Sequence, residues 1–147
     1  MKNKIIVFVY DKKKDKFLLI NNTKHPNHSL NGGLFTINLS INHNEYAKSI
    51  AVEQIKKEIG LIPEEVFSLN WGAVYSLNDE EFKEMNFLAF VNPDKNNLDK
   101  HSSKHKWYSI NPFIEKIEWK DDKELLKKIL IKGINKEVFF DKKERGN

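Results

Sequence analysis

One amphipathic helix is the clearest pattern in this chain. Its apolar residues recur every three or four positions and form a single stripe of Tyr46, Ile50, Ala51, Ile55 and Ile59. Asn44 precedes the stripe as a helix N-cap would, and Gly60 follows it as a left-handed stop would. The opposite side of the helix is polar and carries Gln54, Lys57 and Glu58. We expect function to depend on this polar side.

Strand patterns lie on both sides of the helix. Lys4–Tyr10 and Phe17–Ile20 are rich in β-branched and aromatic residues, and the short polar turn between them predicts an antiparallel hairpin. Phe35–Ile41 alternates apolar with polar residues, which is typical of a half-buried strand. Further strands are predicted at Val66–Leu77, which is one bent strand or two, at Met85–Val91 and at Lys106–Ile110.

Turns and two short helices complete the pattern. Gly72 indicates a bulge or a close approach between strands, and Asn78–Lys83 is predicted to be an acidic turn. Asn111 and Pro112 predict the N-cap and first turn of one helix. A second helix is predicted to begin at a cap, Asp121 or Asp122, and to end at Gly133.

This order of elements predicts one α+β sandwich domain over residues 1–147, with a frayed tail at about 141–147. The chain has no cysteine, so disulfides, zinc–thiolate sites and thiol nucleophiles are excluded, and a cytoplasmic location is the simplest expectation. The apolar run near Met1 is too short for a signal peptide or a membrane span, so no membrane partner is expected. A homodimer is compatible with such a domain.

Charge narrows the expected partners further. The net charge is +4, the lysines are scattered, and Arg145 is the only arginine. Because base recognition relies on arginine and on clustered basic residues, no nucleic-acid partner is expected. A small anionic ligand, such as a nucleotide or a phosphorylated metabolite, fits this surface better.

The stretch Gly32–Leu61 resembles a Nudix box, the family pattern G-x5-E-x7-R-E-U-x-E-E-x-G-U, in which U is aliphatic. The frame fits without a gap. Five residues occupy matching positions: Glu45, Ile55, Glu58, Gly60 and Leu61. The resemblance implies an α/β/α sandwich with a mixed central sheet and the box helix packed on it. Four defining positions differ, because the box glycine, the arginine and two glutamates fall on Leu39, Glu53, Gln54 and Lys57.

The resemblance implies a hydrolase that acts on a nucleoside diphosphate linked to another group and holds magnesium or manganese on helix carboxylates. Here two of the three expected carboxylates are replaced, by Gln54 and Lys57. An ammonium about 4 Å from a dication costs on the order of 8 kcal/mol at an effective dielectric near 20, before relaxation. Whether the chain is an enzyme is therefore uncertain from sequence.

Two functions follow from this resemblance. In a weakened hydrolase, Glu58 and Glu45 would hold the metal, and Glu58 and Glu84 would be catalytic, with Glu80 and Glu81 as neighbouring candidates. In the alternative, an inactive module binds a nucleotide or a partner without metal, and Lys57 contacts the phosphate directly. A plainer interpretation of Lys57 is a surface pair with Glu53, four residues earlier on the helix.

Histidines provide weaker candidates. Loop residues His25 and His28 have no neighbouring carboxylate in the sequence, and His101 and His105 are four apart in a predicted loop. Helical context would be needed for that spacing to form a metal site. We expect His25 and His28 to be exposed loop histidines, and His101 and His105 to be loop histidines that line the rim of a pocket.

Overall fold

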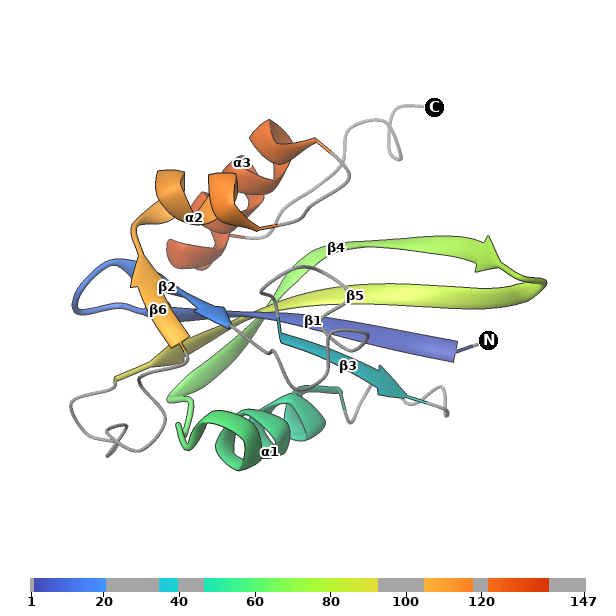
Figure 1. The fold of residues 1–147 in the computed structure, drawn as a ribbon, viewed down its shortest axis with the longest axis horizontal. Helices are drawn as coiled ribbons and strands as arrows, with labels where there is room; N and C mark the ends of the chain where they lie inside the picture. Colours follow the sequence, from blue (N-terminus) through green and yellow to red (C-terminus); the bar gives the residue numbers. More distant parts are fainter. Residues whose placement is uncertain (1, 21–34, 40–46, 93–104, 118–121, 138–147) are drawn as a thin grey trace.

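The computed structural model describes residues 2–20, 35–39, 47–92, 105–117 and 122–137. A mixed sheet lies in the middle, with α1 on one face and α2 and α3 on the other (Figure 1). The predicted α/β/α sandwich is therefore confirmed. In the described part of the chain, no helix combines the length and apolar character needed to cross a membrane.

Nine elements make up this sandwich. The strands are β1 (Lys2–Asp11), β2 (Lys16–Ile20), β3 (Phe35–Leu39), β4 (Glu65–Leu77), β5 (Glu80–Val91) and β6 (His105–Tyr108). The helices are α1 (Ala47–Ile59), α2 (Ile110–Lys116) and α3 (Lys123–Ile134). The sequence predicted every one of these elements, with shifts at several ends.

The strand β1 organises the sheet, whose order is β4-β5-β1-β2-β6. It is antiparallel to β2, which confirms the predicted hairpin, and parallel to β5. Its first half, Asn3–Val7, pairs with β3, and Tyr10 and Asp11 pair with β2. The strand β1 therefore pairs with β3 and with β2 along the same edge.

Side chains of β1 alternate between two cores, as strand geometry requires. Ile5, Val7 and Val9 pack on the α1 side, and Ile6, Phe8 and Tyr10 pack on the side of α2 and α3. From the predicted helix stripe, Ala51, Ile55 and Ile59 are buried and Ile50 is half-buried. The stripe is thus confirmed where the structure describes it; Asn44, Glu45 and Tyr46 lie outside the described residues.

The strands β4 and β5 form a long hairpin that reaches well beyond the helices (Figure 1). Its turn is only Asn78 and Asp79, both with positive φ, of 52° and 65°. Such a turn matches the twist of the strands it joins. The predicted turn through Lys83 is wrong, because residues from Glu80 onward pair with β4. The strand β4 is continuous, with an irregular register between Ser68 and Gly72.

Two predicted helix boundaries need correction. The helix α2 begins at Ile110 with Ser109 as N-cap, so Asn111 is not the cap. Pro112 is accommodated because amides in the first helical turn have no partner within the helix. The helix α3 does not stop at Gly133 but continues to Ile134. Gly133 is buried, and a Cβ there would lie 2.5 Å from Cδ2 of Leu69, so close packing accounts for this glycine.

Asp122 caps α3, as one of the two predicted candidates. Its Oδ1 accepts hydrogen bonds from the backbone amides of Glu124, at 2.9 Å, and Leu125, at 3.2 Å. These bonds satisfy amides that have no partner within the helix. The cap fixes where α3 begins, and its apolar face then covers the sheet through Leu126, Ile129 and Leu130.

Candidate functional site

The polar side of α1 is the candidate site. The helix buries its stripe against the sheet and ends at Ile59. Gly60 follows with a φ of 71°, and its amide donates to the Lys56 carbonyl at 3.0 Å. This packing leaves Lys57 exposed and Gln54 half-buried. Glu58 follows in the same helix, but its side chain and all of Glu45 lie outside what the structure describes.

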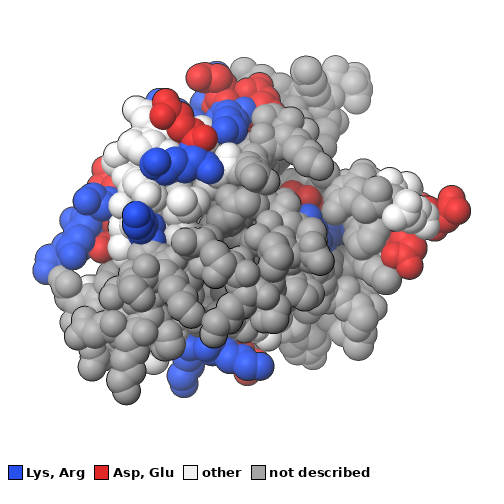
Figure 2. Space-filling view, in the orientation of Figure 1, with Lys and Arg blue, Asp and Glu red and all other residues white. Residues whose placement is uncertain are grey.

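The exposed charged residues of α1 are mostly lysines, which are distributed around the helix and not confined to the side of Lys57. Lys48, Lys56 and Lys57 are exposed, together with Glu53, and Figure 2 shows lysine side chains projecting below the helix. An exposed ammonium is hydrated and can move away from a neighbouring charge, so its effect on a cation is smaller than the estimate for a fixed pair at 4 Å. The exposed lysines of α1 still repel a metal cation and attract an anion, although less strongly than that estimate gives.

Glu84 lies on the opposite face of the sheet from α1. On β5, Phe87 and Ala89 belong to the core beneath α1, whereas Leu88 and Phe90 belong to the core beneath α2 and α3. Alternation along this regularly paired strand places Glu84 on the side of Leu88. Its register neighbour on β1 is Lys4.

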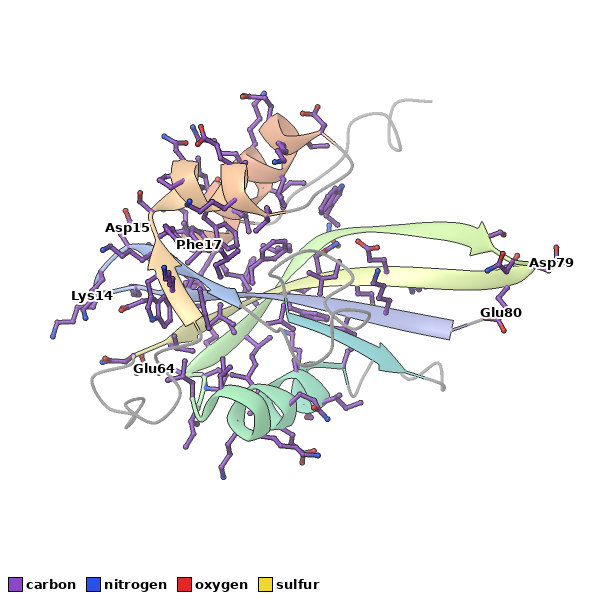
Figure 3. The ribbon with its side chains drawn as sticks, viewed as in Figure 1. Lys14, Asp15, Phe17, Glu64, Asp79 and Glu80 are labelled. Atoms are coloured by element: carbon purple, nitrogen blue, oxygen red, sulfur yellow. The ribbon has the colours of Figure 1, made fainter. Side chains whose placement is uncertain are left out.

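The sheet thus separates Glu84 from the helix that carries Glu58. The shared catalysis by Glu58 and Glu84 stays a prediction, because the Glu58 side chain lies outside what the structure describes. Glu80 and Glu81, the neighbouring candidates, are exposed in the first part of β5, and Glu80 lies at the far end of the hairpin (Figure 3). The structure therefore places Glu84 on the face of the sheet away from α1 and Glu80 at the end of the hairpin.

The donor chemistry of α1 does not fit a usual magnesium or manganese site. A hard dication prefers several carboxylate oxygens, but positions 54 and 57 supply a neutral amide and an ammonium. Among the side chains that the structure describes, no three His, Asp or Glu residues lie close enough to hold a metal ion. The roles assigned to Glu45 and Glu58 as metal ligands stay predictions, since their side chains are outside that set.

The histidine candidates lie almost entirely outside the described residues. His25, His28 and His101 are not described, and His105 is the first residue of β6. A strand position for His105 does not give the helical spacing that a metal pair with His101 would need.

Sequence reasoning missed a second charged region, the turn between β1 and β2. That turn contains Lys12, Lys13 and Lys14, and Lys16 begins β2; all four lysines are exposed. Two aspartates in the same stretch suggested a mixed polar turn, because the sequence does not show which way their carboxylates point.

Solved structures provide the decisive comparison, since the sequence matches no family model and no curated protein. Two structures of a C. elegans Ap4A hydrolase, one of them a binary complex, superpose with TM-scores of 0.54 and 0.53. Each is 17% identical, and the match covers 90% of this chain and 93% of that one. The fold is Nudix-like.

A third neighbour is Shewanella oneidensis NrtR, solved in complex with a 27mer DNA, at 14% identity and a TM-score of 0.53. The match covers 88% of this chain and 59% of NrtR, so the Nudix-like chain spans little more than half of that protein. Because one neighbour binds DNA, the comparisons do not support the prediction that nucleic acid is absent from the partners.

Proposed function

We propose that this Nudix-like module binds an organic diphosphate, such as a nucleotide, through Lys57 of α1 and without a metal ion. The observation that carries the proposal is the exposed Lys57 on the polar side of α1, beside the half-buried amide of Gln54. The position of Glu84 adds support, because it places that carboxylate on the face of the sheet away from α1.

The physical basis is the exchange of one cation for another. In a metal-dependent diphosphate site, a dication neutralises the phosphate charge. An ammonium also neutralises phosphate charge and donates up to three hydrogen bonds, but it does not lower the pKa of a bound water as a metal does. The same side of α1 is therefore suited to binding and poorly suited to hydrolysis.

The Lys57→Ala variant tests this proposal. We expect it to weaken binding of ADP or Ap4A by about tenfold in EDTA, since a charge-assisted hydrogen bond contributes about 1.5 kcal/mol. Isothermal titration calorimetry measures the change. Lys56→Ala is the matched control, because Lys56 is equally exposed and adjacent but points about 100° away around the helix.

Two results would contradict the binding proposal. The first is the absence of binding by both ligands to the unmodified protein in EDTA. The second is an equal loss of affinity in both lysine variants, which would indicate general attraction to a basic surface rather than a contact with Lys57. Circular dichroism of each variant separates loss of binding from loss of fold.

A weak hydrolase is the second candidate, favoured by the near-complete overlap with an Ap4A hydrolase. In that case Glu58 and Glu45 would hold magnesium or manganese. We expect such an enzyme to release phosphate or pyrophosphate from nucleotides only when magnesium is added, and Glu58→Gln to abolish the release. If the folded protein releases no phosphate or pyrophosphate from any nucleotide substrate, that result would count against this candidate.

A further inference from the structure

The turn between β1 and β2, together with the first residue of β2, presents four lysines at one end of the molecule. Lys12, Lys13, Lys14 and Lys16 are all exposed, and Lys14 is labelled at the left end of the molecule in Figure 3. Figure 2 shows lysine side chains projecting at this end, with acidic side chains beside them, far along the longest axis from the acidic tip of the β4–β5 hairpin. The turn is the most densely basic stretch among the described residues.

The two aspartates of this stretch are engaged within the turn. Asp11 is only 2% exposed, and its Oδ1 accepts hydrogen bonds from the backbone amides of Lys13, at 3.0 Å, and Lys14, at 3.2 Å. The hydroxyl of Tyr10 donates to Oδ1 of Asp15 at 2.5 Å. Burial and the bond to Asp15 raise the pKa of Tyr10 well above its usual range, so this donor stays protonated.

These hydrogen bonds engage the carboxylates of both aspartates in the turn. The Asp11 carboxylate accepts from two backbone amides of the turn, whereas the carboxylate of the exposed Asp15, whose φ is 56°, accepts from the Tyr10 hydroxyl. The ammonium groups remain at the surface, where they attract external anions. The turn therefore presents lysine side chains at the surface on a backbone that Asp11 holds in place.

Neighbouring elements extend the basic surface. The pairing of β2 with β6 places Phe17 opposite Tyr108 and Leu19 opposite Lys106. Lys116 of α2 lies over the Tyr108 ring, with Nζ 5.1 Å from the ring centroid. Lys106 and Lys116 are exposed, and exposed Glu115 reduces the local charge by one. We call the turn lysines together with these two the lysine surface: Lys12, Lys13, Lys14, Lys16, Lys106 and Lys116.

We propose that the lysine surface binds the phosphate backbone of nucleic acid, without reading its sequence. Lysine is depleted in protein–protein interfaces but supplies phosphate contacts and counterion release in nucleic-acid binding. Residues 12–16 contain no apolar side chain that would enter a lipid interface. Because the lysine surface has no arginine, bidentate recognition of guanine is not expected. This proposal is independent of the nucleotide proposal for α1.

Fluorescence anisotropy with a labelled DNA duplex, a labelled single-stranded RNA and labelled polyglutamate tests it across roughly 50 to 200 mM salt. If four lysines contact phosphates, the slope of log K against log salt on the duplex should be about −3.6. The variant Lys12→Gln/Lys13→Gln/Lys14→Gln should reduce the magnitude of that slope by about 2.7. The backbone amides at positions 13 and 14 are retained in this variant, so their hydrogen bonds to Asp11 should persist and the turn should stay folded.

The matched control changes three exposed lysines elsewhere: Lys48→Gln/Lys56→Gln/Lys128→Gln. We expect this control to change the slope by less than about 1, the contribution of a single phosphate contact. An equal effect of both triple variants would overturn the proposal, and so would the absence of binding to DNA and RNA at low salt. Polyglutamate, or vesicles containing phosphatidylserine, binding as tightly as nucleic acid would overturn it in favour of a different anionic partner.

Discussion

Replacing Gly72 with alanine should destabilise the protein by about 2–3 kcal/mol, the cost typical of overpacking against an unyielding neighbour. A Cβ at this position would collide with the backbone carbonyl oxygen of Glu84 and would lie 3.1 Å from its carbonyl carbon. A backbone carbonyl in a paired strand cannot rotate away as a side chain can. The strands β4 and β5 would have to separate where Gly72 faces Met85.

The surrounding bulge makes this separation costly. Three residues of β4, Leu69, Asn70 and Trp71, lie opposite the single residue Asn86. The side-chain amide of Asn86 donates to the Trp71 carbonyl at 3.0 Å, and Asn86 is only 2% exposed. Moving β4 away would break this bond and leave buried polar groups without partners, which adds to the steric cost.

Thermal unfolding measures the effect, with an expected decrease in Tm of roughly 4–12 °C for a domain of this size. Gly133→Ala is the comparison, since its Cβ would meet the side chains of Leu69 and Leu88 and not a backbone atom. Alanine also favours helix over glycine by about 1 kcal/mol. A Gly72 variant as stable as the wild type, or less affected than the Gly133 variant, would contradict the close approach.

The sequence identified Gly72 correctly but misread Gly133, and the difference has a physical cause. Close approach within a strand is a common reason for glycine in a β-rich run, whereas a glycine late in a helix usually ends it. Gly133 instead allows α3 to pack near Leu69, a contact that depends on the position of β4. Contacts between distant segments leave no local pattern in the sequence.

At the candidate site, too, local sequence patterns identified only part of the arrangement. The sequence placed Gln54, Lys57 and Glu58 on the polar side of α1, because the helical period alone determines which residues share a side of a helix. It could not place Glu84, because residues 85–91 are almost continuously apolar and both faces of β5 are buried. Without an alternating pattern, nothing indicated that Glu84 faces away from α1. The lysine surface was missed because the directions of Asp11 and Asp15 depend on hydrogen bonds.

The double substitution Gln54→Glu/Lys57→Glu should convert the polar side of α1 from an anion-binding to a cation-binding surface. It changes the local charge by three negative units. In water, each unit charge about 6 Å from a dication contributes about 1.4 kcal/mol, which is close to tenfold in affinity. Allowing for screening by salt, we expect manganese to bind about 100-fold more tightly than to the wild type. Electron paramagnetic resonance of free manganese measures this affinity.

A control with the same charge change identifies the cause. Ser49→Glu/Lys56→Glu also adds three negative units to α1, at two exposed positions on a different side of the helix. If charge alone attracted manganese, both double variants would bind it equally, and the proposed role of the Gln54 and Lys57 side would be wrong. If the polar side is a former metal site, only Gln54→Glu/Lys57→Glu should gain strong binding, because its new carboxylates lie beside Glu58. The same variant should lose nucleotide binding in EDTA, since the ammonium proposed to contact the phosphate is then a carboxylate.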